Sequence, residues 1–307
     1  MKKLFSKGLF SGRVISKSLL AFASLAVFTQ CTDNSTEASA SADSTSATAT
    51  VTEAPAEDWK IGVQFWTFRE FPFVTAIEKA DSAGIKFIEA FPGQALGGNF
   101  KDSFNINMSA ESKKGIQELL SSKGMRVVAF GVTGAKDAAE WNKLFSFAKE
   151  MGIEYINSEP NKSHWGLIDS LSGVYGVKLA IHEHPKNNPY WHPDSVVAAM
   201  KGHPNIYACA DLGHWGRSGL DVVECLKKLD GRIIGVHLKD IKEFNNTKAE
   251  DVVVGTGVLK YPEILAELKR QNFKGLMSVE REGNWQNNMP DVKQTAEYVT
   301  GLMKASK

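Results

Sequence analysis

Short apolar runs recur from Trp59 to about Ala305, and a helical pattern that ends at a turn precedes nearly every one. The residues at these turns are Gly84, Gly124, Gly152, Gly176, Pro204, Gly231 and Gly275. A glycine just past a helix adopts the left-handed conformation that ends it, so that the chain can turn into a strand. Together with the opening run I-G-V-Q-F-W-T-F, the pattern predicts eight strands that alternate with helices, which is typical of βα units in a parallel sheet.

The number of units decides between two α/β folds. Eight βα units in roughly 250 residues is the usual size of a (β/α)₈ barrel, the TIM barrel. A doubly wound open sheet is the rival, but no G-x-G-x-x-G opens the first helix. The sequence therefore predicts a parallel, eight-stranded TIM barrel over residues 58–307.

The first thirty residues have a different composition. They contain the apolar stretch L-L-A-F-A-S-L-A-V-F, which is too short to remain as a membrane-spanning helix and is typical of a secretory signal. The basic residues that precede this stretch are Lys2, Lys3, Lys7, Arg13 and Lys17. A Ser/Thr/Ala-rich tract then runs from residue 31 to residue 57, and it lacks the apolar residues of a core. We expect a signal peptide over 1–30 and a flexible tether over 31–57.

Cys31 directly follows the predicted signal. A signal that ends at a cysteine and continues into a polar tether resembles that of a bacterial lipoprotein. The resemblance implies an exported protein that contacts the membrane through a lipid at Cys31, in the periplasm or at the outer membrane. Phe28, Thr29 and Gln30 depart from the usual small-residue box, so cleavage after Ala26, which would leave a periplasmic protein, is the alternative.

Charge and cysteine content narrow the function classes. The chain has 36 basic and 35 acidic residues, and the first thirty contain five basic residues and no acidic one, so the mature protein carries 31 against 35. This net charge of −4 argues against binding nucleic acid, which requires a basic surface. Beyond Cys31 only Cys209 and Cys225 remain, and two buried thiols are expected in preference to a disulfide.

Charged side chains stand at the ends of three consecutive apolar runs near the C-terminus. They are Asp211 and His214, His237 and Lys239, and Glu280. In a parallel barrel the carboxyl ends of all strands lie on one face, so these side chains should converge. An Asp, a His and a Glu together are a ligand set for a divalent metal ion.

Strand alternation adds further polar residues to the same face. Glu159 ends the fourth run. In the fifth run His182 and His184 share a face, and Glu183 points the other way. Glu89 of the second run points inward, where it is either a salt-bridged interior residue or a functional one.

The motifs L-A-I-H-E-H-P, A-D-L-G-H-W-G-R-S-G-L-D and V-H-L-K-D, in this order, resemble the xylose isomerase-like TIM barrel superfamily, especially its sugar phosphate isomerase/epimerase family. The resemblance implies one divalent metal ion (Mn²⁺, Mg²⁺, Co²⁺ or Zn²⁺) held by Glu, Asp, His and Glu from the last four strands. Asp211, His237 and Glu280 match three of these ligands. His182 occupies the position of the first Glu, so we expect Glu159 to complete the set, with direct binding by His182 as the alternative.

The same resemblance implies a metal-dependent isomerase or epimerase of a sugar or ketosugar. The metal stabilises an enediolate, and a base moves a proton next to the carbonyl. Glu280 is expected to be both ligand and base. The other residues expected to take part in catalysis are Glu159, His182, His184 and Lys239.

Several residues near the predicted strand ends are candidates for contact with a sugar. The expected substrate-binding residues are His214, Arg217, Trp66, Phe91 and Trp215. The G-T-G segment at Gly255–Gly257 resembles a phosphate loop, but a plain turn is the better interpretation. A preference for phosphorylated substrates is therefore not predicted.

Two other functions compete with the isomerase. A metal-dependent lyase or dehydratase that acts on 3-keto sugars or glycosides would use the same metal and base. A DNA-repair endonuclease of the same fold would need additional histidines after the second and third strands, where the sequence reads A-F-P-G and A-F-G-V. The acidic balance and the export signal also argue against it, and a small carbohydrate is the expected partner.

Overall fold

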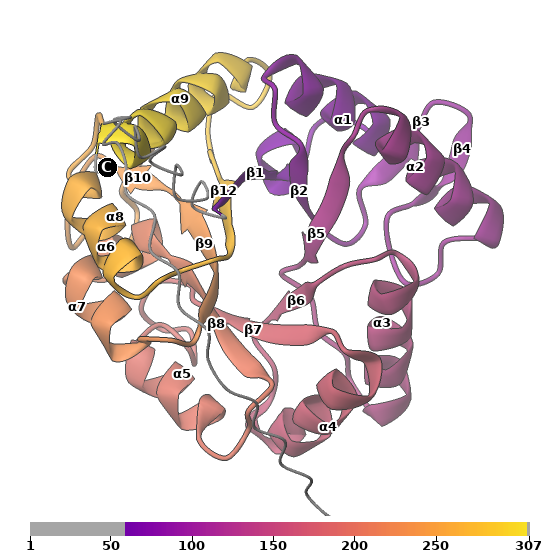
Figure 1. Cartoon of the computed structure of the whole chain (residues 1–307), viewed down its shortest axis with the longest axis horizontal. Helices are drawn as coiled ribbons and strands as arrows, with labels where there is room; N and C mark the ends of the chain where they lie inside the picture. Colours follow the sequence, from indigo (N-terminus) through magenta and orange to yellow (C-terminus); the bar gives the residue numbers. More distant parts are fainter. Residues whose placement is uncertain (1–58, 306–307) are drawn as a thin grey trace, which may run out of the picture. The chain divides into compact units, whose positions relative to one another are not determined.

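The computed structural model describes residues 59–305, within which eight parallel strands close into a barrel (Figure 1). The predicted TIM barrel is confirmed. Around the barrel the strands are β1 (Lys60–Gln64), β12 (Leu276–Val279), β9 (Ile233–Leu238), β8 (Ile206–Asp211), β7 (Lys178–His182), β6 (Tyr155–Ser158), β5 (Arg126–Phe130) and β2 (Phe87–Ala90). Because all of them run in the same direction, their carboxyl ends form one face of the barrel.

Helices surround the barrel (Figure 1). They are α1 (Phe73–Ser82), α2 (Ala110–Ser122), α3 (Ala138–Glu150), α4 (Trp165–Tyr175), α5 (Pro193–Met200), α6 (Leu212–Arg217), α7 (Val222–Lys228), α8 (Tyr261–Arg270) and α9 (Met289–Ala305). Left-handed glycines follow several helices as expected, for example Gly176 after α4 with a φ of 66°, but after α8 the left-handed residue is Asn272, with a φ of 53°, and not Gly275. At the start of α6 the Asp211 side chain accepts a hydrogen bond from the backbone N–H of His214, so that a strand-end residue also begins a helix.

The apolar core has two parts. The larger part lies between the strands and the helices and contains stacked aromatic rings, for example Phe73 and Phe104 at 4.6 Å between ring centroids. The smaller part has buried side chains from five different strands and consists of Val128, Ala129, Tyr155, Ala180, Cys209 and Leu276. Beyond it, towards the carboxyl ends of the strands, the interior of the barrel is polar. This change in polarity defines the place of the site.

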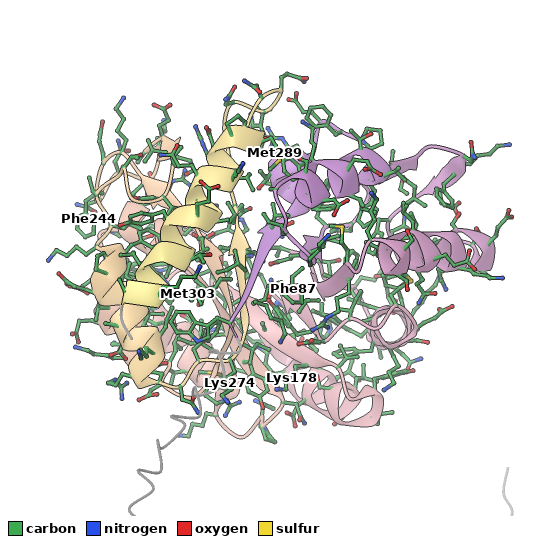
Figure 2. All side chains as sticks on the ribbon, turned by 45° about the horizontal axis from the view of Figure 1, so that its top comes forward. Phe87, Lys178, Phe244, Lys274, Met289 and Met303 are labelled. Atoms are coloured by element: carbon green, nitrogen blue, oxygen red, sulfur yellow. The ribbon has the colours of Figure 1, made fainter. Side chains whose placement is uncertain are left out.

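The opposite end of the barrel carries exposed charges. Lys178 and Lys274 lie near each other at this N-terminal face, at the start of β7 and just before β12 (Figure 2). With Glu154 and Tyr155 they line a hollow of about 290 Å³.

Some elements depart from the simple alternation. The first strand ends at Gln64, and Phe65–Phe68 form the short 3₁₀ helix η1, which begins where the Gln64 side chain accepts a hydrogen bond from Trp66 N. A second 3₁₀ turn, η2 (Lys162–His164), precedes α4. Two antiparallel ribbons interrupt the βα order, β3 (Ala95–Gly97) with β4 (Phe100–Ser103), and β10 (Asp240–Ile241) with β11 (Asp251–Val252).

Cys209 and Cys225 are both buried and free, as expected. Within residues 59–305 no helix is both long enough and apolar enough to cross a membrane. The predicted signal peptide, tether and lipid-anchored Cys31 lie outside the described residues, so export stays a prediction.

Candidate metal centre

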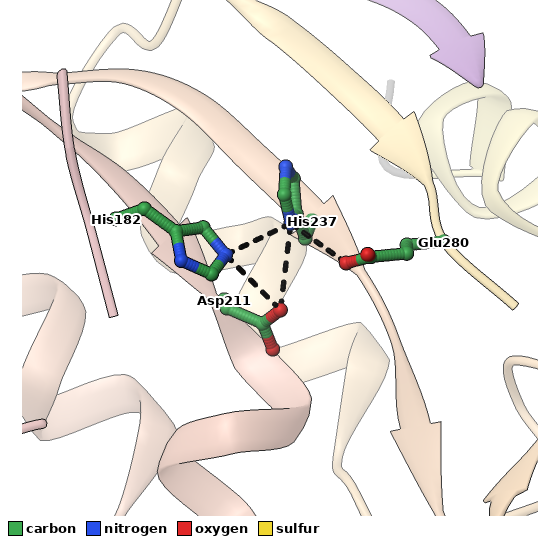
Figure 3. A group of neighbouring side chains, drawn as sticks. All are labelled: His182, Asp211, His237 and Glu280. Carbon is green, nitrogen blue, oxygen red and sulfur yellow. Dashed lines mark hydrogen bonds and ion pairs between the residues drawn. The ribbon is translucent and has the colours of Figure 1, made fainter. Parts of the chain in front are cut away.

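Four side chains converge at the carboxyl ends of four adjacent strands (Figure 3). His182 ends β7, Asp211 ends β8, His237 lies in β9, and Glu280 directly follows β12. Each offers one ligand atom, and the four atoms all lie within 4.8 Å of one another. His237 Nδ1 is central: it is 2.8 Å from Glu280 Oε2, 3.4 Å from Asp211 Oδ2 and 3.2 Å from His182 Nε2.

Two carboxylate oxygens of this group lack hydrogen-bond donors. Within residues 59–305, Asp211 Oδ2 and Glu280 Oε2 are buried and accept no hydrogen bond. The Lys239 ammonium lies 3.2 Å and 3.1 Å from them, but not in hydrogen-bonding geometry. A buried charge without such partners is costly, and a divalent cation is the usual compensation. Two imidazole nitrogens with two carboxylate oxygens form a donor set that suits zinc and similar divalent ions, so the residues present fit a metal.

Two further carboxylates orient the imidazole rings. Both oxygens of Glu89 lie 3.1 Å from His237 Nε2, and Glu159 Oε1 lies 3.4 Å from His182 Nδ1. Ser278 Oγ donates to Glu89 at 2.7 Å and fixes that carboxylate. His237 Nε2 and His182 Nδ1 thus face these carboxylates, and the other nitrogen of each ring points to the centre of the group. A ring that is hydrogen-bonded through one nitrogen can direct the lone pair of the other at a metal, which is the arrangement of metal-binding histidines.

The pKa values of the acidic and histidine side chains at the site are shifted because these groups are buried next to groups of opposite charge. Burial alone would raise the pKa of Glu159, but hydrogen bonds from His182 and His184 lower it to about 2. Burial favours neutral His182, yet the nearby Asp211 and Glu159 carboxylates raise its pKa to about 9. For Glu280 burial is outweighed by Lys239 and His237, which hold its pKa well below its usual range. Without metal, Glu159 and Glu280 are therefore ionised and His182 is protonated.

The structure differs from the expected ligand set at one position. His182, not Glu159, belongs to the four-membered group, and Glu159 forms a second group with His182 and His184. The reason is that β6 ends at Ser158, one residue before Glu159, whereas β7 ends at His182. Glu159 instead bonds to His184 Nδ1 and accepts from Asn188 Nδ2 at 2.7 Å. Of the two alternatives that the sequence left open, the geometry favours direct binding by His182.

Lys239 and His214 lie beside the centre. Lys239 Nζ is 3.4 Å from His214 Nε2 and donates to Glu282 at 3.1 Å. The Arg217 guanidinium is buried against the Asp251 carboxylate and bonds His214 Nδ1 at 3.2 Å. Burial lowers the pKa of His214 well below its ordinary value, so the ring is neutral. His214 therefore faces the site, and Arg217 orients it from behind without lining the cavity described next.

The site opens into a cavity of about 310 Å³. His182, His214 and Glu280 form its polar floor, and Trp66 and Phe91 form part of its wall. This volume lies in the range of small-molecule pockets. The expected positions of Trp66 and Phe91 at the site are thus consistent with the geometry.

Trp215 does not reach this cavity. Residues Leu212–Arg217 form helix α6, so Trp215 points away from the face that carries His214, and its side chain is fully buried in the core. The expectation that Trp215 contacts a sugar rested on its position near a predicted strand end, and the complete burial of its side chain contradicts it.

Some functional neighbours had no clear signal in the sequence. Glu183, expected to point away from the site, is fully buried and accepts from the backbone N–H of Asp211 at 3.2 Å, which fixes the strand end that carries a ligand. Asp251 comes from the short ribbon β10–β11, whose contact with Arg217 no local pattern indicates. Glu282 had a weak signal, because it shares strand parity with Glu280.

Comparisons with known proteins agree with this architecture. The family model for the xylose isomerase-like TIM barrel matches residues 77–302. An inosose dehydratase of Mesomycoplasma hyopneumoniae (strain 7448) is 32% identical over 150 residues, which cover 43% of this chain and 50% of that protein. The chain thus spans about half the length of the curated relatives it matches.

Two solved structures extend the similarity over most of the barrel. A protein from Parabacteroides distasonis ATCC 8503 is 34% identical, with a TM-score of 0.66, over 80% of this chain and 99% of that one. The IolI protein, solved with a bound zinc atom, has a TM-score of 0.65 at 19% identity, over 80% of this chain and 98% of that one, and this level of identity shows a shared fold.

Proposed function

Because this chain belongs to the xylose isomerase-like TIM barrel family, we propose that it is a divalent-metal-dependent lyase of a keto-sugar or keto-cyclitol. The enzyme removes the proton next to the carbonyl and then eliminates an oxygen substituent from the following carbon. The observation that carries this proposal is the group of His182, Asp211, His237 and Glu280 at the floor of a cavity, with two buried carboxylate oxygens that lack hydrogen-bond donors.

These four residues would hold the metal ion, which when bound supplies a Lewis acid that polarises the substrate carbonyl and makes the adjacent proton more acidic. Two imidazole ligands favour Zn²⁺, Mn²⁺ or Co²⁺ over Mg²⁺, which prefers oxygen ligands. The zinc atom in the structurally similar IolI protein supports the choice of Zn²⁺ as one metal to test.

Glu280 is the base in this proposal. It lines the cavity, and Lys239 and His237 keep its carboxylate ionised. A carboxylate next to the substrate carbon takes the α-proton while the C–H electrons form the new C=C bond. Lys239, 3.1 Å from Glu280 Oε2, holds the carboxylate in place.

His184 is the acid. Its ring lines the cavity and is partly exposed, and its Nδ1 bonds to Glu159, which leaves Nε2 for the leaving group. When the C–O bond on the β carbon breaks, the departing oxygen takes the proton from Nε2 and leaves as water or an alcohol. Solvent then restores the proton of His184 and removes that of Glu280, so the reaction needs no oxidant or reductant.

The choice of a lyase over an isomerase rests on the distribution of proton-transfer groups. Epimerisation in related enzymes is expected to use two glutamates on opposite faces of one carbon, and here the first of them is replaced by His182, which belongs to the metal group. The similarity of this chain to an inosose dehydratase also supports an elimination reaction. A sugar isomerase or epimerase is the second candidate, because Glu280 and His184 line one cavity and together could remove a proton and return it.

The two candidates give different products in D₂O. Wild-type protein loaded with Zn²⁺ or Mn²⁺ should be incubated with inososes, ketoses and 3-keto-glycosides, and followed by ultraviolet absorbance and, after removal of the metal, by NMR. A lyase produces an unsaturated ketone and free water or alcohol. A deuterated isomer or epimer without an unsaturated ketone would favour the second candidate, and no reaction with any of these substrates would contradict both.

A further inference from the structure

The cavity above the metal centre has a polar floor and an apolar outer wall. Its floor carries the charged and polar side chains of the centre. Its outer wall is formed by Trp66, Phe91, Pro92 and Val132, which carry no charge and are all partly exposed. A free monosaccharide has hydroxyl groups around the whole ring and would leave many of them facing this wall without partners.

The Trp66 ring is held in a fixed orientation. Its Nε1 donates to Glu282 Oε1 at 3.2 Å, and it packs nearly perpendicular to the Phe91 ring, with 5.1 Å between centroids and an interplanar angle of 87°. The Arg69 guanidinium lies 4.8 Å from its centroid and 3.6 Å from that of Trp285. A rigid aromatic surface loses little entropy when a flat group stacks on it.

One loop that often binds phosphate in this fold, the loop after the seventh strand, here binds a side chain of the protein itself. TIM barrels often bind phosphate with loops that follow the seventh and eighth strands. Here the loop after β9, the seventh barrel strand, directs its backbone N–H groups at the buried Asp240 carboxylate. Gly255 N and Gly257 N donate at 3.0 Å, and Leu259 N donates at 3.2 Å. The Asp240 carboxyl group thus takes up the N–H donors of this loop, and a Cβ at Gly257 would overlap that group.

We propose that the substrate is an unphosphorylated keto-glycoside with a flat, apolar aglycone that packs against Trp66 and Phe91, with its face on one ring and its edge on the other. This inference rests on the proposed function and names its substrate class. The keto-sugar ring lies over the floor, and the aglycone lies against the outer wall. Where the carbonyl is two carbons from the anomeric carbon, the aglycone oxygen is itself the leaving group: the α C–H bond and the anomeric C–O bond break, a C=C bond forms, and His184 protonates the aglycone.

The aglycone site is tested by binding, without turnover. The probes are phenyl β-D-glucopyranoside and methyl β-D-glucopyranoside, which carry no ketone, with glucose 6-phosphate and glucose as a second pair. Calorimetry on metal-loaded wild-type protein should give at least about tenfold tighter binding of the phenyl than of the methyl glucoside, from aromatic stacking. Glucose 6-phosphate should bind no more tightly than glucose.

Variants of Phe91, in the outer wall of the cavity, test whether this wall causes the preference for the phenyl glucoside. Phe91→Ala should bring the phenyl-to-methyl affinity ratio close to one, and Phe91→Leu, which keeps the bulk, should also reduce it. The matched control is Phe244→Ala, because Phe244 is exposed and lines a different hollow with Asp221 and Leu259. This control should keep the wild-type ratio, and circular dichroism checks that each variant is folded.

A wild-type ratio near one, tighter binding of the phosphate, or an unchanged ratio in both folded Phe91 variants would overturn the inference. Failure of the lyase proposal would look different, because it would appear as no unsaturated ketone and no α-proton exchange while the phenyl preference in binding remained.

Discussion

The two ends of the barrel carry the same types of charged residue in different environments. At the N-terminal face, Lys60 and Arg126 pair with Glu154 at 3.4 Å and 2.6 Å, and the Glu154 and Arg126 side chains are 41% and 45% exposed. At the carboxyl-terminal face, Asp211 is fully buried and lies within 3.6 Å of both His182 and Lys239. Each of these charges at the first end is partly exposed to water, whereas the buried charges at the second end depend on their neighbours.

This difference shows why one end is the site. Exposed ion pairs contribute about 0–1 kcal/mol, because water solvates each partner almost as well. Buried charges lose several kcal/mol of hydration, so a cluster of them does not persist for stability alone. Buried, mutually perturbed titratable groups in a cavity are typical of functional sites. The following predictions test this contrast, from the largest expected effect to the smallest.

Asp211→Asn should have the largest effect. Asparagine is also a good N-cap, so the start of α6 should remain, while the ligand charge is lost. Elemental analysis should show bound metal falling from about one ion per chain to a small fraction, and kcat/KM should fall by at least about 10³-fold. Asp230→Asn, which changes an exposed aspartate just before β9, is the control and should leave both unchanged. Full metal content in Asp211→Asn would remove Asp211 from the ligand set.

Glu280→Gln should abolish removal of the α-proton. The amide keeps the shape of the side chain but cannot act as a base, so exchange with D₂O should slow by at least about 10²-fold at saturating metal. Saturation separates this effect from weaker metal binding. Glu154→Gln makes the same change at the N-terminal face and should exchange at the wild-type rate. If Glu280→Gln also exchanges at that rate, the base is instead Glu159, His182 or His184.

Glu89→Gln should weaken metal binding without removing a ligand. Glu89 lies 3.1 Å from His237 Nε2, and loss of its charge makes His237 a poorer donor. Competition with a chelator should show an affinity about 10–100-fold lower. An unchanged affinity would mean that Glu89 is only a structural partner of Ser278 and Asn157.

Metal affinity should rise with pH up to about 9. The pKa of His182 in the metal-free protein is raised to about 9, so below this pH the metal must displace a proton from the ring. Each unit of decrease below pH 9 should lower the apparent affinity by at least about tenfold, because His182 must release a proton on binding and His237, whose pKa the surrounding carboxylates also raise, must release another. Titrations at several pH values in a buffer that does not bind metal measure the slope. A flat profile between pH 7 and 9 would contradict direct binding by His182.

Glu154→Gln should have the smallest effect. It removes two partly exposed ion pairs, with Lys60 and Arg126, so the free energy of unfolding should fall by at most about 1 kcal/mol. Urea unfolding measures this change. A loss of several kcal/mol would show that the N-terminal face depends on its charges as strongly as the site does.

The sequence was sufficient for the fold and for the prediction that charged side chains converge at one end of the barrel. All eight predicted strands are present, because each apolar run is long enough to be buried on both faces and is bounded by a turn. The charged residues at the ends of these runs, such as Asp211 and His237, had to meet once the strands were parallel and closed.

The details depend on geometry that a linear pattern does not contain. Glu159 is displaced from the ligand group because β6 stops one residue earlier than the alternation assumed. Trp215 turns into the core because α6 begins immediately after Asp211. The pairing of Glu89 with His237 joins residues 148 positions apart, and it follows from the tilt of the strands around the barrel. Strand ends and cross-barrel distances therefore had to come from the structure.

The central claim is that a metal held by His182, Asp211, His237 and Glu280 is required to remove the proton beside a carbonyl. The most direct test is to titrate metal-free protein with Zn²⁺ or Mn²⁺ in D₂O and to measure deuterium incorporation into a keto-glycoside by mass spectrometry. We predict that incorporation is absent without metal, rises in proportion to the metal bound, and saturates at about one ion per chain. Incorporation at the full rate in chelator-treated protein would contradict the claim.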